Sequence, residues 1–355
     1  MSTIILAIRT EVFYTSIALS KDENIVYQSD IDHSRDDFIL MDEVVDQLPF
    51  RRDAIMNRLR QDAVDVKSIE YVVAEGGLLK PCESGVYEID KIMVGDMIDG
   101  VGGDDVINMA GLLAFTIANT LRVKSLVVDP ASVDERSEIA SFFTHPITRK
   151  KSLFHALVHK YLSNKYARSL NKKYEDMNII FCHVGDRNVS VAAHRKGLVV
   201  DVNQAYMGFG PMGFFETGTM PVSNVMDMLL KKHYTKEEML KLVNRNATFN
   251  YYIHTNSCDE IMSSHKDNRT DTILDVMSYQ IAKEIASHYV TLEGKIDAII
   301  LSGKIFSDKR FFKYLSTRIE DIAPIASYPK DYTIEAMVYN VLQTIKGEKK
   351  VKTYD

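Results

Sequence analysis

The sequence predicts an α/β protein with two similar lobes, each built around a mixed β-sheet. Two observations lead to this prediction. Short β-type runs separated by turns occur twice along the chain, in the pattern of a β-meander. After each meander, helical and strand-like periodicities alternate. The chain has 355 residues, about two domains' worth, and 46% of them are hydrophobic, which is enough for two cores.

In the first half we expect a three-stranded meander, a long helix, a buried strand, a second helix and a further strand. The turn at 20–23 joins the second and third strands of the meander. The last strand stops at Pro130, because proline has no N–H to donate to a ladder. In chain order the ranges are 3–8, 12–19 and 24–28 for the meander, then 35–62, 69–74, 106–121 and 125–129.

The second half repeats this pattern, beginning with a long helix before its meander. More helices follow, with one strand among them, and the last helix leads to a charged segment. We expect that segment, 346–352, to be a solvated end of the chain. The predicted ranges are 149–172, then 178–183, 188–193 and 197–202 for the meander, then 223–243, 271–292, 297–302, 307–319 and 333–346.

Composition and charge exclude several classes of protein. The net charge of −6 provides no electrostatic footprint for nucleic acid. Cys82, Cys182 and Cys258 are too far apart in sequence to form a closed disulfide set or a zinc knuckle. No apolar run approaches the ~20 residues of a membrane span, and the first residues do not resemble a secretion signal. We therefore expect a cytoplasmic protein that binds neither nucleic acid nor membranes.

Six collinear stretches resemble the butyrate kinase branch of the acetate kinase family. They are GGLLKP at 76–81 with ESGVY at 83–87, VDP at 128–130 with VDE at 133–135, RKKSLFHAL at 149–157, HRKG at 194–197 with VDVN at 200–203, YQIAKEI at 279–285 and DAIILSG at 297–303. The resemblance covers nearly the whole chain, from about residue 3 to residue 346. Six such stretches in the same order identify the chain as a member of this family.

The resemblance implies the actin-like ATPase fold, with two ribonuclease H-like lobes and a cleft between them for nucleotide and carboxylate. It divides the chain into an N-terminal lobe at 1–145, completed by 333–355, and a C-terminal lobe at 146–332. The family transfers a phosphoryl group between ATP and a short-chain carboxylate, with Mg²⁺, and generally as a homodimer. Such a transfer needs cations and backbone N–H groups around the phosphoryl oxygens.

The segments that match the family's two phosphate-binding turns have lost most of the family's residues. At 9–16 a bulky, acidic run replaces the family's Asn-Pro-Gly-Ser-Thr-Ser-Thr-Lys. At 183–191 only Gly185 remains of three consecutive glycines, and Asp186 stands where the backbone should approach phosphate. The adenosine-side pair of glycines is reduced to Gly303. The resemblance still assigns Gly185 and Gly303 to nucleotide binding.

Two positions at which the family has arginine carry the opposite charge in this chain. They are Glu75, which precedes Gly76, and Glu216. Two unit charges ~4 Å apart interact by about 4 kcal/mol at an effective dielectric near 20, so each reversal would repel a transferring phosphoryl group. Loss of one arginine that stabilises the transition state commonly costs on the order of 10³ or more in rate.

Other residues that the family uses are present. By resemblance, Asp129 matches the transfer-site aspartate, His155 and His183 match histidines near the transferred phosphate, and Glu335 matches the glutamate tied to magnesium. Each also has a structural alternative, with Asp129 as a turn cap, the histidines as core residues and Glu335 as a partner of the helix dipole. The substrate pocket implied by the resemblance includes Gly76, Gly77, Gly210 and Pro211.

These observations leave two functional hypotheses. In the first, the protein is an active kinase for butyrate or a branched-chain fatty acid, with Arg9 and Arg187 as substitute cations. In the second, these arginines pair with Glu75 and Glu216, and the protein is a non-catalytic homologue. It would act by dimerising, with itself or with an active butyrate kinase chain. The lost glycines and the reversed charges favour the second hypothesis.

Overall fold

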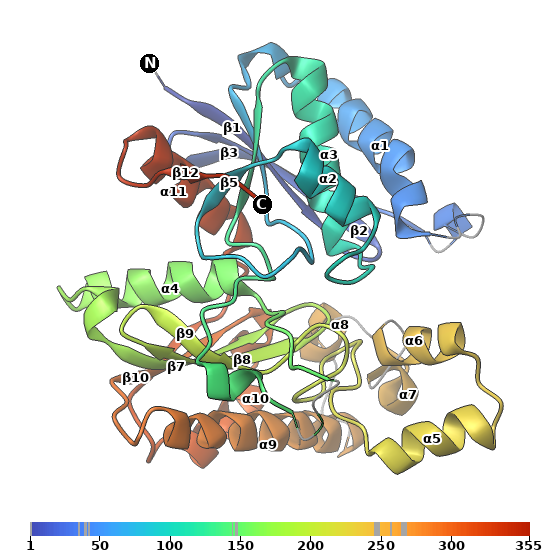
Figure 1. Ribbon diagram of the computed structural model, residues 1–355, viewed down its shortest axis with the longest axis vertical. Coiled ribbons are helices and arrows are strands. Elements are labelled where there is room, and N and C mark those ends of the chain that lie inside the picture. The colour runs from blue at the N-terminus through green and yellow to red at the C-terminus, as the bar shows by residue number, and fades with distance from the viewer. Residues whose placement is uncertain are drawn as a thin grey trace. The chain divides into compact units, whose positions relative to one another are not determined.

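The structure is a computed structural model that describes residues 2–34, 36–38, 41, 43–143, 145, 148–244, 249–255, 258–263 and 268–355. The chain forms two compact units (Figure 1). The N-terminal unit takes in Met1–Asp134, Ala156–Val158 and Tyr332–Asp355, and the C-terminal unit takes in Glu135–His155 and His159–Asp331. Each unit has one mixed sheet and its own hydrophobic core, which confirms the predicted fold class.

Seven strands form the sheet of the N-terminal unit, in the order β12-β5-β6-β4-β1-β2-β3. β1 (Ile4–Thr10), β2 (Tyr14–Lys21) and β3 (Asn24–Asp32) form the antiparallel meander. β4 (Tyr71–Ala74) pairs in parallel with β1, and β6 (Lys124–Val128) pairs in parallel with β4. Parallel pairing brings the carboxyl ends of β1, β4 and β6 to the same edge of the sheet.

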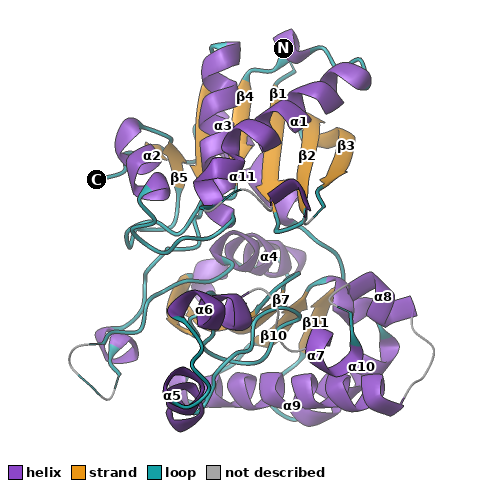
Figure 2. Cartoon of the chain, turned by 90° about the vertical axis from the view of Figure 1, so that its right-hand side faces the viewer, coloured by secondary structure: helices purple, strands orange, loops and turns teal. Residues whose placement is uncertain are grey.

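Helices cover both faces of this sheet (Figures 1 and 2). α3 (Ile107–Leu121) and α11 (Thr333–Ile345) lie on opposite faces, while α1 (Leu48–Gln61) and α2 (Lys91–Ile98) pack beside α3. Strands covered on both faces need apolar residues throughout, and β1 is buried along nearly its whole length.

The C-terminal unit repeats the arrangement with five strands, in the order β11-β10-β7-β8-β9. β7 (Asn178–Val184), β8 (Val189–Arg195) and β9 (Leu198–Val202) form its meander. β10 (Ala298–Ser302) pairs in parallel with β7, and β11 (Ile325–Tyr328) pairs in parallel with β10. The carboxyl ends of β7 and β10 therefore lie side by side.

Helices pack on both faces of this second sheet, and successive side chains of β7 contact the helices on one face and then on the other. α4 (Ala156–Ser169) lies on one face, and α9 (Asn268–Thr291) and α10 (Lys309–Ile319) lie on the other (Figure 1). Phe181 of β7 stacks on His159 of α4 with ring centroids 4.2 Å apart. Its neighbours along the strand belong to the core shared with α9 and α10.

Shorter elements complete the two units. Within the described part of the chain, no helix is long and apolar enough to cross a membrane. The short helices are α5 (Val222–Leu230), α6 (Lys236–Asn244), α7 (Phe249–Ile253) and α8 (Cys258–Ser263), and the short strands are β5 (Val86–Glu88) and β12 (Val351–Lys352).

The first helix was predicted over 35–62, but in the structure it begins only at Leu48, so the prediction was wrong for the residues described before that point. Short 3₁₀ turns at Asp36–Phe38 and Val44–Gln47 precede α1. Pro49 stands in the first turn of the helix, where its missing N–H has no intrahelical partner to lose. Residues 35, 39–40 and 42 of the predicted range lie outside the described residues.

Two other predicted helices also differ from the structure. The helix predicted at 149–172 begins at Ala156. Tertiary bonds hold the segment before it, since the carbonyl of Leu153 accepts a hydrogen bond of 2.8 Å from the backbone N–H of Ala205. The helix predicted at 223–243 is divided into α5 and α6, and between them His233 has a φ of +57°, which a right-handed helix does not accommodate.

The charged segment at 346–352 is solvated, as predicted, since residues 346–351 are exposed, but it is not a free end of the chain. Val351 and Lys352 form β12, which pairs with β5. Tyr354 is only 3% exposed. Its hydroxyl donates a hydrogen bond of 2.7 Å to Asp96 Oδ2 and accepts one of 3.0 Å from the backbone N–H of Lys80. The charge of the tail is visible in the sequence, but the distant partners that fix it are not.

Candidate functional site

The predicted site residues fall into two groups, one in each unit. In the N-terminal unit, most of them lie where β1, β4 and β6 end, namely Arg9, Glu75, Gly76, Gly77 and Asp129. Glu335 belongs to the same unit and is the exposed residue in the otherwise buried first turn of α11. The group in the C-terminal unit consists of His155, His183, Gly185, Arg187, Gly210, Pro211, Glu216 and Gly303.

Arg9, near the end of β1, is matched by negative charge. Its side chain is 9% exposed, and Nη2 lies 2.6 Å from Oε1 of Glu11. Its Nε lies 4.0 Å from Oε1 of Glu75. Nη1 also donates a hydrogen bond of 3.2 Å to the hydroxyl of Tyr14. One largely buried guanidinium therefore faces two carboxylates, and these three charged groups together carry a net negative charge.

A second, fully buried arginine holds the turn between β1 and β2. Arg51 of α1 donates hydrogen bonds of 3.0 and 3.1 Å to the carbonyl oxygens of Val12 and Tyr14. It also donates to Oγ1 of Thr15 at 2.9 Å and to Oε1 of Gln47 at 3.0 Å. Burial lowers the pKa of Arg51 to about 10, so the side chain stays charged at neutral pH. The turn that was predicted to match the family's first phosphate-binding segment is thus hydrogen-bonded to Arg51.

Sequence reasoning missed Arg51, although the sequence contains a signal for it. Arg51, Ile55 and Leu59 are spaced four apart and are the buried residues of α1. A charged residue in the apolar stripe of a helix must find partners in the core, because an unpaired buried charge is very costly. The pattern therefore indicates a buried arginine, but its partners in the β1–β2 turn lie 36 to 39 residues away in sequence and could not be read from it.

Asp129 follows β6 with a strained backbone and a fixed carboxylate. Its φ is +39°, a value that residues with a side chain rarely adopt. Its Oδ1 accepts hydrogen bonds of 2.7 Å from Oγ of Ser84 and 2.8 Å from the backbone N–H of Gly85. The backbone N–H of Asp129 donates to the carbonyl of Gly85 at 2.9 Å. This geometry fits a turn cap, and a role in phosphoryl transfer stays a prediction.

Packing within the N-terminal unit alone requires the glycines that follow Glu75. A Cβ atom on Gly76, whose φ is +88°, would lie 2.7 Å from Cγ1 of Val127. A Cβ on Gly77 would lie 2.7 Å from Oδ1 of Asn108. Both distances are too short for real atoms, so these glycines do not by themselves indicate a substrate pocket.

The carboxylates of the predicted site fit a magnesium ion that is bound together with a nucleotide. Among the residues that the structure describes, no three His, Cys, Asp or Glu side chains gather as a group that could hold a metal ion. Mg²⁺ is usually bound by one or two carboxylates together with substrate phosphates. Asp129 and Glu335 are single carboxylates of that kind, so the residues present fit a nucleotide-borne ion rather than a resident one.

In the C-terminal unit, two histidines lie against the turn between β7 and β8. The rings of His155 and His183 are tilted toward each other, with centroids 4.5 Å apart. Nδ1 of His155 lies 2.9 Å from Oγ of Ser190, and Nδ1 of His183 lies 3.2 Å from Oγ of Ser302. A Cβ on Gly185 would lie 2.8 Å from Nε2 of His155, so only glycine fits beside this ring.

The turn itself is compact and carries a buried cation. The backbone N–H of Gly185 donates a hydrogen bond of 3.0 Å to the carbonyl of Asn188, which closes the turn. Arg187 is 6% exposed, and its guanidinium carbon lies 5.5 Å from the centre of the Tyr206 ring. This distance is within the range of a cation–π interaction.

Glu216 packs against the same turn and is 2% exposed. Its Oε1 accepts a hydrogen bond of 2.8 Å from Nδ2 of Asn188. Its backbone N–H donates to the carbonyl of Arg187 at 3.2 Å. Glu216, which was predicted to stand at a position of a family arginine, is therefore held by the residues of the turn.

The remaining predicted glycines also sit where the backbone leaves no room. Gly210, which precedes Pro211, has a φ of +118°, and a Cβ there would lie 2.3 Å from Nδ2 of Asn203. Gly303 has a φ of +130°, and a Cβ there would lie 2.1 Å from the carbonyl oxygen of Val184. Gly303 therefore packs directly on the end of β7, whatever its role toward a nucleotide.

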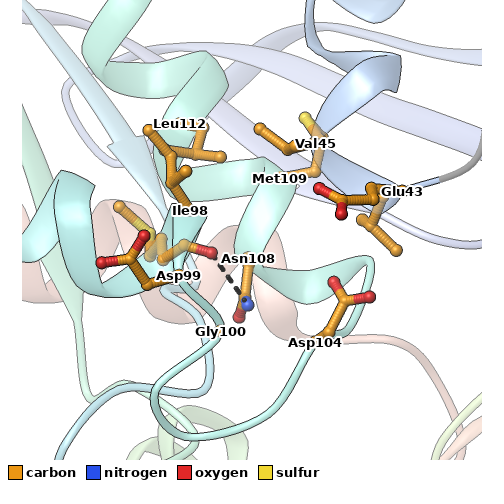
Figure 3. Close-up of a pocket in the computed structure, with 11 residues that line it drawn as sticks. Glu43, Val45, Ile98, Asp99, Gly100, Asp104, Asn108, Met109 and Leu112 are labelled. Carbon is orange, nitrogen blue, oxygen red and sulfur yellow. Dashed lines mark hydrogen bonds between the residues drawn. The ribbon is translucent and has the colours of Figure 1, made fainter.

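A pocket of about 360 Å³ lies elsewhere in the N-terminal unit (Figure 3). Its walls come from the segment before α1 and from α2, α3 and the loop between these two helices. Asn108 anchors it by donating a hydrogen bond of 3.3 Å to the carbonyl of Met97. None of the described residues that line it is a predicted site residue. They are Glu43, Val44, Val45, Met97, Ile98, Asp99, Gly100, Asp104, Asn108, Met109 and Leu112.

Comparisons with known proteins place this geometry in a family. The chain is 33% identical over 342 residues to butyrate kinase 2 of Clostridium acetobutylicum, and the matched region covers 96% of each chain. Residues 141–317 match the Acetokinase family. The chain belongs to this family. It is also 32% identical over 342 residues to a probable butyrate kinase of Clostridium botulinum, again covering 96% of each chain.

Solved structures show the same fold for this acetokinase family member. The acetate kinase of Porphyromonas gingivalis superposes with a TM-score of 0.76 at 14% identity, covering 97% of this chain and all of that one. A propionate kinase of Francisella tularensis superposes with a TM-score of 0.73 at 13% identity, covering 95% and 98%. The predicted family and its actin-like fold are therefore confirmed.

Replacing Arg51 tests whether the β1–β2 turn depends on it. We expect Arg51→Met to lower the free energy of unfolding by about 3 kcal/mol, because it leaves several buried oxygens without their charged donor. Urea denaturation followed by circular dichroism measures the change. The matched control is Arg52→Met, since the side chain of Arg52 is 39% exposed and should cost no more than about 0.5 kcal/mol. Equal effects of the two substitutions would contradict the assigned role.

Proposed function

We propose that this chain is a butyrate kinase-like protein with a degenerate phosphoryl-transfer site and weak or no kinase activity. The observation that carries the proposal is the position of Arg9, with Glu11 at 2.6 Å and Glu75 at 4.0 Å. The cation that could replace a lost arginine is already neutralised by two carboxylates. The cofactors of the proposed ancestral activity are ATP and Mg²⁺, and its substrate class is the short-chain carboxylates.

The electrostatics of phosphoryl transfer support this proposal. The transferring group spreads negative charge over three oxygens, and catalysis consists largely of placing positive charge around them. A carboxylate at ~4 Å from such a group would oppose it by about 4 kcal/mol at an effective dielectric near 20. Glu11 and Glu75 surround Arg9, so an incoming phosphate would have to compete with them for one guanidinium.

Backbone hydrogen bonding in the β1–β2 turn supports it as well. A phosphate-binding turn needs N–H groups that point at the ligand. In this turn the N–H of Glu11 donates to the carbonyl of Tyr14 at 2.9 Å. The carbonyls of Val12 and Tyr14 accept from Arg51. One N–H and two carbonyls of this turn are therefore already bonded to protein groups.

A second candidate function is an active kinase for butyrate or a branched-chain fatty acid. It is favoured by the group in the C-terminal unit, where His155, His183 and Gly185 are retained next to Arg187. In this alternative Arg187 serves as a substitute cation, its guanidinium carbon 5.5 Å from the centre of the Tyr206 ring. The same alternative needs Arg9 to exchange its carboxylate partners for phosphate.

An acyl phosphate assay tests which candidate is correct. With Mg-ATP and butyrate, trapping of the product with hydroxylamine should give a rate lower than that of a butyrate kinase relative by about 10³-fold or more. Glu75→Arg should raise the rate, because it restores a cation and removes a competitor for Arg9. Glu75→Gln is the matched control and should raise the rate less, because it only removes the negative charge. Wild-type turnover equal to that of the relative would contradict the proposal.

We also propose that the protein acts in the cytoplasm through dimerisation, as a homodimer or with an active homologue. The support is an apolar stripe on α5, formed by Val222, Met226 and Leu230. These residues are spaced four apart and are 77%, 46% and 66% exposed. Exposed apolar stripes of this kind are typical of surfaces that bind another protein.

Sedimentation of purified protein should show a dimer that does not depend on nucleotide. Met226→Asp with Leu230→Asp should shift it to monomer, since both charges would have to be buried in the interface. Asn224→Asp, on the other side of α5, is the control and should leave the dimer intact. If the wild type is a monomer, or if the dimer persists in the double variant, the stripe on α5 is not a dimer interface.

A further inference from the structure

The pocket in the N-terminal unit has the dimensions of a small-molecule site. Its volume of about 360 Å³ lies within the range of roughly 300–1,000 Å³ that is usual for ligand pockets. Its described lining residues all belong to this unit, and none of them is a residue of the proposed phosphoryl-transfer site. A ligand bound there would therefore be recognised by residues that the proposed function does not use.

The loop between α2 and α3 fixes the shape of this pocket. The backbone N–H of Val101 donates a hydrogen bond of 3.1 Å to the carbonyl of Asp96, and Nδ2 of Asn108 donates one of 2.9 Å to the carbonyl of Gly103. Oδ1 of Asn108 accepts one of 2.7 Å from the backbone N–H of Leu78. The loop is held by protein groups alone, as is usual for a pocket that exists before its ligand binds.

Apolar side chains form most of the pocket wall, since six of the eleven described lining residues are apolar. Leu112 and Met109 of α3 are buried, at 2% and 0% exposed. Ile98, at the end of α2, lines the same pocket but is 48% exposed. A large hydrophobic side chain beside a cavity is stabilised when a ligand covers it, because burial of apolar surface is favourable. The wall therefore favours a ligand with an apolar body.

The charged side chains of the pocket are all acidic. They are Glu43, Asp99 and Asp104, and no Lys, Arg or His is among the described lining residues. Asn108 donates both of its N–H groups to backbone carbonyls. The described lining side chains therefore offer a ligand negative charge and hydrogen-bond acceptors but no donor. This chemistry opposes a carboxylate or a phosphate and favours a cation.

Two of the acidic residues border the apolar wall from different segments. Asp99 ends α2, and Glu43 precedes the 3₁₀ turn Val44–Gln47. Figure 3 shows their carboxylates on opposite sides of the pocket, with Ile98 and Leu112 between them in this view. We propose that the pocket binds an aliphatic diamine. Its two ammonium groups pair with Asp99 and Glu43, and its methylene chain lies against Ile98 and Leu112.

A metal ion fits this pocket less well than a diamine. Among the described residues, no three His, Cys, Asp or Glu side chains form a group that could hold a metal ion. An inorganic cation would also leave the exposed side of Ile98 in water, whereas a methylene chain would cover it.

Methyl spectra of the full-length chain test the proposal without any kinase assay. The protein is labelled with carbon-13 in its isoleucine δ1 methyl groups and titrated with putrescine, cadaverine and hexamethylenediamine. The signal of Ile98 is assigned by its loss in Ile98→Val. With at least one diamine it should shift and saturate, with half of the shift at about 1 mM or below. The signal of Ile180, in the core of the other unit and assigned by Ile180→Val, should not move.

Matched ligands separate the contributions of charge and chain. Hexylamine keeps the methylene chain but only one ammonium group, and should require at least about fivefold more ligand than hexamethylenediamine for the same shift. Hexanediol has the same length without charge and should give no saturable shift. Equal shifts with the diamine and the diol would overturn the role of the carboxylates. Displacement of the diamine by magnesium chloride, but not by sodium chloride of the same ionic strength, would indicate a site for inorganic cations and overturn the diamine.

Two conservative variants place the ligand in the pocket. Asp99→Asn and Glu43→Gln each remove one charge from an exposed side chain, so neither should unfold the protein. Each should raise the diamine concentration at half-saturation at least about fivefold, and both together about 20-fold or more. The matched control is Asp53→Asn, because this carboxylate of α1 is 62% exposed and does not line the pocket. It should change that concentration by less than about twofold.

Two outcomes would overturn the proposal. The first is a wild-type Ile98 signal that does not shift with any of the three diamines. The second is a double variant that binds the diamine as well as the Asp53→Asn control does. Both outcomes are independent of acyl phosphate formation, because no residue of the proposed phosphoryl-transfer site is changed.

Discussion

A guanidinium that is mostly removed from water needs negative charge beside it, and the pairing of Arg9 with Glu11 and Glu75 meets this need inside the protein. In a phosphoryl-transfer site the same need is met by the substrate, so the substrate's charge is what binds it. Here two carboxylates of the protein pair with the guanidinium of Arg9, Glu11 at 2.6 Å and Glu75 at 4.0 Å. An arginine that is already paired with carboxylates gains little from binding an anion, because binding must first break the existing pairs.

The repeated topology explains why the two groups of predicted residues are equivalent in position. In each unit a meander strand is paired in parallel with the next strand of the sheet, so polar residues after these strands gather at one edge. The two edges now differ in character. In the N-terminal unit Arg51 binds the turn and acidic residues pair with Arg9, while the C-terminal unit keeps two histidines and a glycine at its turn.

The sequence predicted the fold better than it predicted the site. The strands of both meanders and the family were predicted correctly, because alternating apolar runs and collinear motifs are local signals. The helix predicted before Leu48 was wrong. The anchoring of the chain's last residues was missed, because Tyr354 is held by Lys80 and Asp96, far away in sequence. The roles of the predicted site residues stay predictions.

Contacts between distant segments also explain what the sequence could not show at the site. The pairing of Arg9 with Glu75 was one of two alternatives until the distance between them was known. Arg51 was not singled out by any motif either, because its importance comes from hydrogen bonds to carbonyls of another segment. Hydrogen-bond networks of this kind depend on geometry finer than the spacing of residues along a chain.

Calorimetric titration of the purified protein with Mg-ATP, alone and with butyrate, tests the central claim most directly. If the protein's own carboxylates have taken the place of the phosphate, binding should be weaker than about 1 mM, which corresponds to no more than about 4 kcal/mol. Glu75→Gln should strengthen the binding, because it frees part of the charge of Arg9. A micromolar dissociation constant for the wild type would show that the site still holds phosphate, and would contradict the account.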